Sequence, residues 1–263
     1  MPDAAWLQAA ALGLGAAALL SIAVWAASVP RRDVSIVDMA WGFLVVVPAV
    51  VVSVILPAGP RVAVALGAAI LWASRLSIHI AWRHRGQPED PRYQAIRQRN
   101  QPHFQWKSLY LVFGLQALLG WVVALPLMAA VASPARWNVF DALGLVLAAF
   151  GLAYEATADA QLARFRADPG NRGKVMDRGL WRTSRHPNYF GECCFWWGMW
   201  LVAAAAGAWW TVISPLLMTV LLLKVSGVPL LERNLDHRPG YADYVRRTPA
   251  FVPRRVKDAA CGR

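Results

Sequence analysis

The chain has 263 residues, of which 57% are hydrophobic and only 16% are charged, and its formal net charge is +12. An ordinary soluble domain carries about 25% charged residues, so this composition argues against a soluble protein. Because the charges lie between long apolar stretches, we attribute the positive balance to membrane topology and to an anionic cofactor. We expect no nucleic-acid partner.

Apolar stretches long enough to cross a bilayer, about 20 residues each, recur along the chain. They predict an all-α, polytopic integral membrane protein with about seven transmembrane helices. The N-terminal stretch lacks the positive leader of a secretory signal peptide, so we expect it to be retained as the first helix. The last two spans form one apolar block, which we expect to break near Gly207 into a hairpin. The expected spans are 5–28, 34–56, 62–82, 108–131, 138–163, 188–206 and 208–230.

The distribution of basic residues predicts the orientation. Seven spans place 23 of the 27 Lys and Arg residues on one side of the membrane. Only Arg61 and Arg136 fall on the other side, and Arg75 and Lys224 lie within spans. By the positive-inside rule the N-terminus is outside and the C-terminus is cytosolic. We expect a single membrane domain over 1–263 whose cytosolic parts are two basic loops and an amphipathic tail, at 83–107, 164–187 and 231–263.

The three cysteines do not form a disulfide framework. Cys193 and Cys194 are adjacent, and Cys261 is in the tail. Their spacing matches no metal site, so we interpret them as structural thiols and expect no metal.

Ionisable residues inside apolar spans are costly and are candidates for function. Asp38 lies in the second span, one turn beyond Arg31 and Arg32. It is either an interfacial carboxylate paired with arginine or an acidic or orienting group in a pocket. Arg75 and His79 are four residues apart on one helix face, as either a pocket wall or a structural pair. Of these two, Arg75 is the better anion-binding candidate because a guanidinium can hold a phosphate with two hydrogen bonds.

Glu155, Asp159 and Arg166 follow one stripe of the fifth span towards a basic loop. Their offsets favour either an intramembrane salt-bridge cluster or a polar wall facing a ligand that has several hydrogen-bond donors. The loop itself contains Arg172, Gly173 and Lys174. It is either an ordinary cytosolic turn or a place where backbone N–H groups and cations meet phosphate.

The most informative segment surrounds the start of the sixth span. Pro187 suits the first turn of a helix, and Arg185 and His186 stand just before it, where backbone donors favour an anion. Asn188 and Glu192 lie four residues apart on the helix that follows. A carboxylate buried beside an amide and cations needs a partner or ligand, so this segment predicts a binding site.

The segment Arg185-His186-Pro187-Asn188-Tyr189-Phe190-Gly191-Glu192 resembles the signature of the steroid 5-alpha-reductase C-terminal superfamily. Within that superfamily the chain is most similar to the DUF1295 branch. The resemblance covers most of residues 31–253. Three further stretches carry it: Asp33-Val34-Ser35-Ile36-Val37-Asp38 with Trp41-Gly42, Arg85-Gly86 through Tyr93, and Arg238-Pro239-Gly240-Tyr241 through Pro253.

This resemblance implies a seven-helix membrane reductase that binds NADPH between its C-terminal helices and cytosolic loops. Members reduce an activated C=C bond, typically of an enone in a steroid or sterol, so the expected partners are a lipophilic small molecule and membrane lipid. The cofactor-binding positions that it implies, together with the rest of the signature, are Glu155, Asp159, Arg166, Lys174, Arg185, His186, Asn188, Tyr189 and Glu192.

The sequence departs from the steroid 5-alpha-reductases where those enzymes polarise the substrate carbonyl. It has no Gln-Glu pair in the second span and no tyrosine in the third. Asp38, Arg75 and His79 stand in those regions and are the candidate catalytic residues.

Two alternatives remain. The same superfold includes membrane methyltransferases such as isoprenylcysteine carboxyl methyltransferase, which share an Arg-His-Pro-x-Tyr-x-Gly signature and bind S-adenosylmethionine. Asn188 and Glu192 favour the reductases. The other alternative is a lipid-binding or assembly protein without catalytic activity.

Overall fold

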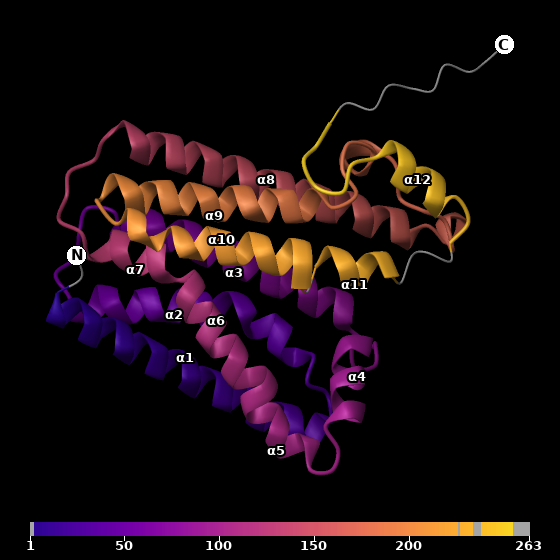
Figure 1. Cartoon of the computed structure of the whole chain (residues 1–263), viewed down its shortest axis with the longest axis horizontal. Coiled ribbons are helices and arrows are strands. Elements are labelled where there is room, and N and C mark those ends of the chain that lie inside the picture. Colours follow the sequence, from indigo (N-terminus) through magenta and orange to yellow (C-terminus); the bar gives the residue numbers. More distant parts are fainter. Residues whose placement is uncertain (1–2, 226, 234–237, 255–263) are drawn as a thin grey trace. The chain divides into compact units, whose positions relative to one another are not determined.

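The computed structural model describes residues 3–225, 227–233 and 238–254, and all regular structure in them is helical, as the sequence predicts. These residues form two compact units, which are described separately (Figure 1). The first comprises Met1–Asp141 and Trp200–Ser214. The second comprises Ala142–Met199 and Pro215–Arg263. Cys261 and the end of the expected tail lie outside the described residues.

Long apolar helices dominate the first unit, and shorter helices follow them. The helices are α1 (Ala4–Arg31), α2 (Ile36–Ile55), α3 (Val62–His84), α4 (Pro91–Arg99), α5 (Phe104–Ser108), the π-helical η1 (Leu109–Gly114), α6 (Leu115–Val123), α7 (Leu125–Ala132) and the 3-10 turn η4 (Trp209–Val212). The expected basic loop at 83–107 is therefore partly helical, because Asp90 caps a short helix that Pro91 begins.

Helix α2 is the centre of the first unit and packs against α1, α3, α6 and α7. Small residues allow this close packing. A Cβ atom on Gly42 would lie 2.7 Å from the Ala73 Cα of α3, and one on Gly120 would lie 3.2 Å from the backbone of Leu44. Helices without bulky side chains at a crossing can bring their backbones together, which is how membrane helices commonly associate.

Beyond α2, a fully buried ion pair joins the α2–α3 turn to the start of α8 (Val139–Ala167). Arg61 donates from Nε to Asp141 Oδ1 and from Nη2 to Asp141 Oδ2, both at 2.7 Å. The same guanidinium donates to the carbonyl oxygens of Ala135 and Arg136. Two chain turns and a helix start are thus held by one side chain.

The second unit is built on the long part of α8 and on α9 (Pro187–Ala205). Its other elements are the 3-10 turns η2 (Pro169–Asn171) and η3 (Gly179–Arg182), then α10 (Ile213–Val220), the π-helical η5 (Leu221–Val225), α11 (Val228–Arg233) and α12 (Tyr241–Arg247). Thr219 of α10 accepts a hydrogen bond from Trp197 Nε1 of α9, so these helices lie side by side.

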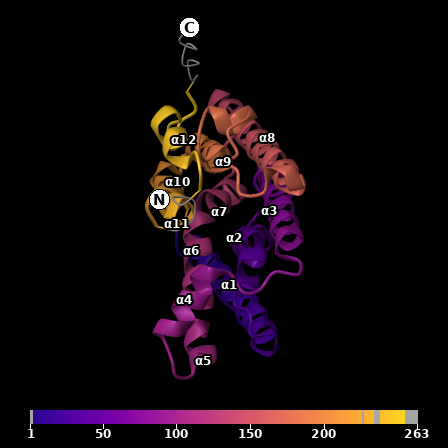
Figure 2. The same ribbon diagram turned by 90° about the vertical axis from the view of Figure 1, so that its right-hand side faces the viewer.

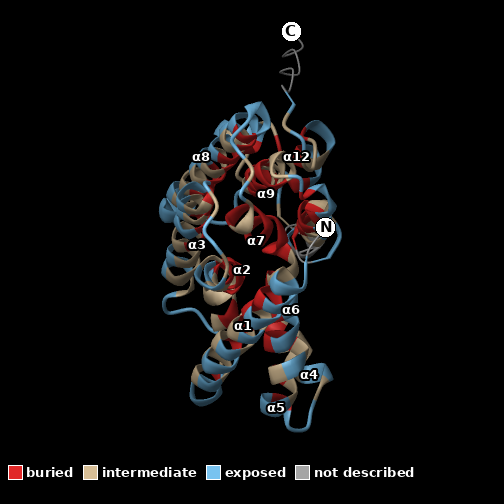
Figure 3. Ribbon diagram, turned by 90° about the vertical axis from the view of Figure 1, so that its left-hand side faces the viewer, coloured by how far each residue is buried: buried red, intermediate tan, exposed pale blue. Residues whose placement is uncertain are grey.

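Glycines bring α8 and α9 into backbone contact. A Cβ atom on Gly191 would lie 2.6 Å from the Glu155 nitrogen, and one on Gly198 would lie 2.5 Å from the Ala148 nitrogen. On the α8 side, a Cβ atom on Gly151 would lie 2.4 Å from the Phe195 nitrogen. Much of α9 is consequently buried (Figure 3).

Five helical segments of the described residues are long and apolar enough to cross a membrane, which supports a multi-pass membrane protein. They are Ala4–Arg31, Ile36–Ile55, Val62–His84, Phe104–Val123 and Val139–Ala167. The expected sixth span coincides with α9, while the expected seventh is a shorter apolar run, Trp209–Val225. The break expected near Gly207 is present, where the glycine has a φ of +86° between α9 and η4.

Candidate functional site

The candidate catalytic residue Asp38 lies in the first turn of α2 and is held by α4. Its Oδ2 accepts a hydrogen bond from Arg92 Nη2 at 2.8 Å, and its Oδ1 accepts one from the Tyr93 hydroxyl at 2.6 Å. Tyr93 also accepts a hydrogen bond from Gln116 Nε2 of α6 at 3.0 Å. Asp38 is therefore paired with an arginine, as one of the two interpretations expected, but the partner is Arg92 rather than Arg31 or Arg32.

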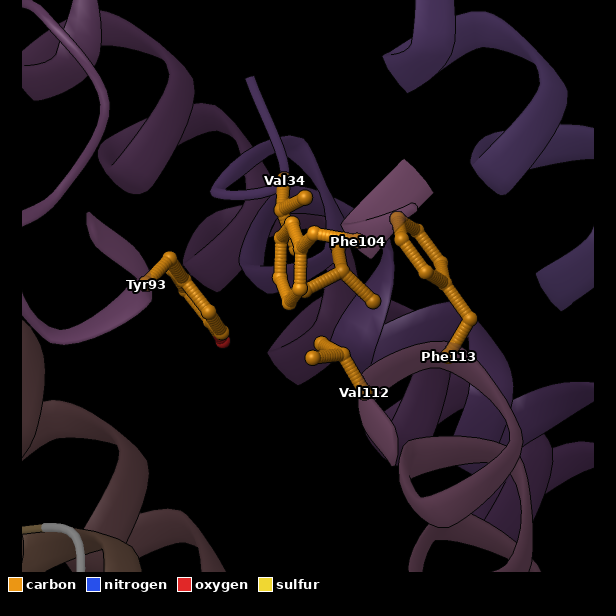
Figure 4. Packing of buried hydrophobic residues seen from close by; sticks show 6 residues of the cluster. Val34, Tyr93, Phe104, Val112 and Phe113 are labelled. Carbon is orange, nitrogen blue, oxygen red and sulfur yellow. The ribbon is translucent and has the colours of Figure 1, made fainter. Parts of the chain in front are cut away.

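The ring of Tyr93 is buried against apolar side chains of the first unit (Figure 4). This cluster comprises Val34, Val37, Tyr93, Phe104, Val112 and Phe113. Burial, and then the negative charge of Asp38, raise the pKa of Tyr93 well above its usual range, so the phenol stays protonated and donates to Asp38. Burial alone would lower the pKa of Arg92, but the hydrogen bond with Asp90 and the charges of Asp38 and Asp90 raise it overall.

Two further acids hold the α1–α2 turn, one beside α4 and the other at the end of α3. Glu89 accepts two hydrogen bonds from Arg97, at 2.7 and 2.9 Å, and a third from the backbone nitrogen of Val34. Asp33 lies 2.8 Å from His84 Nε2 at the end of α3. The chemistry-bearing groups at this end of the first unit therefore form one connected network.

The other two catalytic candidates, Arg75 and His79, lie one turn apart on α3 and are both half-buried. The His79 ring lies 6.3 Å from the ring of Trp82. All three catalytic candidates thus belong to the first unit, and their catalytic role stays a prediction.

All nine cofactor-binding candidates belong to the second unit. Four of them are brought together where α8 and α9 touch. Glu155 and Asp159 of α8 and Glu192 of α9 are buried. Asn188 of α9 donates from Nδ2 to Asp159 Oδ1 at 3.2 Å. Three carboxyl groups and an amide therefore lie along one helix–helix seam rather than on surfaces facing lipid.

The loop after α8 carries the cationic candidates. Arg166 in the last turn of α8 and Lys174 in the loop are both exposed. The Asp168 side chain accepts a hydrogen bond from the Gly170 nitrogen at 2.9 Å and fixes the first turn of the loop. Gly173 has a φ of +78°, which other residues adopt rarely, so the loop depends on glycine before Lys174.

Arg185 and His186 share an acceptor that the sequence interpretation missed. Glu232 Oε1 of α11 accepts from Arg185 Nε at 2.8 Å and lies 3.0 Å from His186 Nε2. Arg185 also donates to the carbonyl oxygens of Val245 and Thr248. Its guanidinium therefore stabilises the C-terminal end of α12 as well as pairing with Glu232. Glu232 lies one turn beyond an apolar run, and nothing in the sequence indicated that it pairs with Arg185 and His186.

Backbone hydrogen bonds hold the signature segment to the chain that follows α12. The Arg185 nitrogen donates to the Pro249 carbonyl oxygen at 2.9 Å, and the Arg254 nitrogen donates to the Thr183 carbonyl oxygen at 2.9 Å. The Tyr244 hydroxyl donates to the Trp181 carbonyl oxygen, and burial raises the pKa of this phenol. Residues 244–254 therefore hold residues 181–185 in place.

Two buried acceptor atoms in this segment have no hydrogen-bond partner among the described residues, namely His186 Nδ1 and Asn188 Oδ1. Burial lowers the pKa of His186 despite its hydrogen bond with Glu232, so the imidazole is neutral near pH 7. Because Nε2 faces the Glu232 carboxylate, it carries the proton and leaves Nδ1 as an acceptor. The ring of Tyr189 is stacked on His186, with centroids 5.5 Å apart. These two buried acceptors thus require donors from outside the described chain.

The described residues contain no group of three or more His, Cys, Asp or Glu side chains that could hold a metal ion. Cys193 and Cys194 are free thiols in α9. The sulfur of Cys193 lies 3.7 Å from the Thr219 hydroxyl of α10, which places it in the packing between these helices.

Comparison with known proteins gives one match. The family model "Protein of unknown function (DUF1295)" covers residues 24–248. No curated protein and no solved structure matches the chain. Because the matched region includes α2 to α11 and most of the described residues, the chain belongs to the DUF1295 family.

Proposed function

We propose that the chain is a membrane-embedded, NADPH-dependent reductase that acts on an activated C=C bond of a lipophilic, steroid- or isoprenoid-like substrate. The observation that carries the proposal is the pair of buried acceptors, His186 Nδ1 and Asn188 Oδ1, that lack donors among the described residues. The resemblance of the Arg185–Glu192 segment to the steroid 5-alpha-reductase C-terminal superfamily supports the same conclusion.

The residues of the second unit fit NADPH chemically. Its carboxamide and ribose hydroxyls are hydrogen-bond donors, and His186 Nδ1 and Asn188 Oδ1 are buried acceptors without a donor among the described residues. Its phosphates need cations. Arg172 and Lys174 are exposed and make no ion pair with any described residue. The loop therefore offers positive charge that no protein acid in the described chain neutralises.

We assign each candidate residue a role in binding the cofactor. Arg166 and Lys174 hold phosphate, and Asp159, Asn188 and Glu192 orient the ribose or the carboxamide. Arg185 already donates to Glu232 and to two carbonyl oxygens, so we assign it a positioning role at the start of α9. Glu155 lies on the same seam and completes the polar wall.

When bound, NADPH supplies the hydride, and the chain's own residues orient the substrate. Both oxygens of Asp38 already accept hydrogen bonds, from Arg92 and Tyr93, which fits an orienting group better than a proton donor. Arg75 or His79 of α3 is therefore our choice for polarising the conjugated carbonyl. Stabilising the negative charge that develops on that oxygen is usually the largest catalytic contribution.

The proposal includes seven spans, with the N-terminus outside and the C-terminus in the cytosol. Helix α9 has 19 residues, about the length that a bilayer requires, and the run Trp209–Val225 with the apolar start of α11 supplies the last crossing, which ends before Glu232. Reporter fusions test the orientation. Alkaline phosphatase fused after Arg136 should be active on the outer side, and a fusion after Arg254 should be inactive. The reverse pattern would reject the orientation.

Binding of NADPH and of S-adenosylmethionine to the purified full chain tests the function. We expect saturable NADPH binding, measured by the change in nucleotide fluorescence, and no binding of S-adenosylmethionine. Arg166→Ala should raise the dissociation constant for NADPH at least about tenfold, the loss expected for one charge-assisted contact. Arg164→Ala, an exposed arginine on the same helix, is the matched control and should leave it unchanged.

The outcomes separate the alternatives. Binding of S-adenosylmethionine alone would support the methyltransferase, and binding of neither molecule would support a lipid-binding protein. NADPH affinity that is unchanged in Arg166→Ala would reject the assignment of that residue.

A further inference from the structure

One end of the first unit carries more positive charge than its own acids can neutralise. Four acids lie there, and each is engaged by a neighbouring base. Asp33 pairs with His84, Glu89 pairs with Arg97, and Asp38 and Asp90 both pair with Arg92. The hydrogen bonds with Arg97 and Arg92 are part of the packing of α4, so these two arginines serve the fold.

Four of the remaining cations, at the end of α3 and in α4 and α5, are not used in this way. Arg83, Arg85 and Arg99 are exposed, Lys107 is half-buried, and none of the four makes an ion pair with a described residue. Arg83 and Arg85 end α3 and begin the loop, Arg99 ends α4, and Lys107 is in α5. We name these four residues the α4 basic surface.

Large aromatic side chains accompany these cations. Trp82 is 54% exposed and precedes Arg83, and Trp106 is 62% exposed and precedes Lys107. Tyr110, one turn further, is also 62% exposed. Trp106 packs on Trp25 of α1, with ring centroids 5.3 Å apart. Exposed tryptophan and tyrosine rings with adjoining lysine and arginine are typical of the level at which a membrane protein meets lipid headgroups.

The direction of α4 also agrees with a position at the level of the lipid headgroups. Figure 1 shows α4 running at a steep angle to α2 and α3 rather than continuing along them, and Figure 2 shows it next to α5. Its contacts explain this position, because Asp90 N donates to Ser35 Oγ and Tyr93 donates to Asp38 at the start of α2. Most of α4 is half-buried or exposed (Figure 3). A short helix at a steep angle to the ends of apolar helices runs along a membrane surface rather than through it.

We infer that the α4 basic surface binds the headgroups of anionic phospholipids. The unpaired positive charge favours an anionic partner. The exposed tryptophans beside the cations favour a lipid over a soluble anion. Basic residues beside a bilayer each contribute about fivefold to binding of anionic lipid. The inference concerns the first unit alone and does not depend on the proposed reductase activity.

The test compares two lipids that differ only in headgroup. The purified full chain is titrated with pyrene-labelled phosphatidylglycerol or phosphatidylcholine in mixed detergent micelles, and energy transfer from tryptophan reports binding. We expect the wild-type chain to prefer phosphatidylglycerol at least about tenfold at low salt. The variant with Arg83→Gln, Arg85→Gln, Arg99→Gln and Lys107→Gln should lose most of this preference.

A neutral variant of the same surface is the matched control. Gln87→Ala, Gln98→Ala and Gln101→Ala change exposed side chains beside the cations without changing the charge, and should keep the preference. Retention of the preference by the fourfold variant, or its absence in the wild type, would overturn the inference. Displacement of phosphatidylglycerol by a short RNA of equal charge would also overturn it, in favour of a nucleic-acid surface.

A measurement on the unchanged chain guards against a variant that fails to fold. About 0.5 M salt shortens the screening length to a few ångströms and should reduce the wild-type preference to about twofold or less. A preference that persists at this salt would show that the headgroup is not held by exposed cations.

Discussion

The hydroxyl of Tyr93 donates a hydrogen bond of 2.6 Å to Asp38, although 55 residues separate the two in the chain. The contact joins α4 to the first turn of α2. It belongs to the network that also contains Arg92 and Gln116. Hydrogen bonds to a charged acceptor are stronger than neutral ones, so this contact makes a direct test of whether the network stabilises the first unit.

Tyr93→Phe should lower the free energy of unfolding by about 1.5–3 kcal/mol, because it removes a donor to a carboxylate and leaves the Gln116 amide without its acceptor. Thermal unfolding of the purified protein in detergent measures the change. Tyr110→Phe removes a hydroxyl from a 62% exposed ring and serves as the control, with no expected change. Equal stability of Tyr93→Phe and wild type would contradict a stabilising role for this bond.

The buried pair of Arg61 and Asp141 gives a larger expected effect. Arg61→Leu leaves the Asp141 carboxylate uncompensated at 0% side-chain exposure, so we expect a loss of about 3–5 kcal/mol. The double variant Arg61→Leu with Asp141→Leu should recover part of this loss, because the uncompensated charge is gone. Arg136→Ala changes an exposed cation between α7 and α8 and should cost less than about 0.5 kcal/mol. A double variant less stable than the single one would reject this explanation.

Backbone contact between α8 and α9 makes Gly191 intolerant of a side chain. Gly191→Ala places a Cβ atom 2.6 Å from the Glu155 nitrogen and 2.7 Å from the Gly151 oxygen, and backbone atoms cannot move aside cheaply. We expect a loss of at least about 2 kcal/mol, seen as a lower Tm. Gly67→Ala is the matched control because no atom lies within 4 Å of its added Cβ, and it should gain a few tenths of a kcal/mol. Similar Tm values for the two variants would contradict the close packing.

The pairing of His186 and Glu232 predicts that stability falls as the pH falls. Burial lowers the pKa of His186 below its usual 6.5, so the unfolded chain takes up this proton first, and stability is lost as pH drops below about 6.5. Burial raises the pKa of Glu232, but hydrogen bonds from Arg185 and His186 lower it more, below its usual 4.5. The Glu232 contribution is therefore present above about 4.5 and is lost below that pH.

Tm measured between about pH 7.5 and about pH 5 tests the histidine part of this prediction. Wild-type Tm should fall across this range, and His186→Gln should flatten the fall because the titrating group is gone. His103→Gln changes an exposed histidine and should keep the wild-type slope. An unchanged slope in His186→Gln would assign the pH dependence to other groups.

The sequence predicted the long helices well, because the bilayer sets a minimum length of apolar chain that can be counted directly. The expected spans 5–28 and 62–82 agree with α1 and α3 to within a few residues at each end. It did not predict α4, whose residues are polar and whose position depends on a capping aspartate and on distant partners. For this reason the sequence predicted a loop where the structure has a short helix.

The sequence predicted the site residues that lie inside apolar helices, where a polar group is energetically costly. It did not predict the residues that are recognised only by their contacts in the folded chain. Asp159 and Asn188 were chosen because polar groups are expensive in an apolar helix, and the structure brings them to 3.2 Å. Three contributing residues lie outside the apolar spans, namely Arg92, Tyr93 and Glu232. Polar residues there have little desolvation cost, so the sequence did not single them out. Their site partners Asp38 and His186 are 46 or more residues away in the sequence, and only the folded chain brings them together.

The glycine seam between α8 and α9 also constrains how the second unit can move. Helices whose backbones touch at Gly151, Gly191 and Gly198 cannot slide or separate without breaking several contacts together, so they act as one rigid body. A ligand that reaches Asp159 and Asn188 would therefore meet carboxylate and amide groups whose spacing is set by the two helix backbones. The polar seam would keep the same geometry from one binding event to the next.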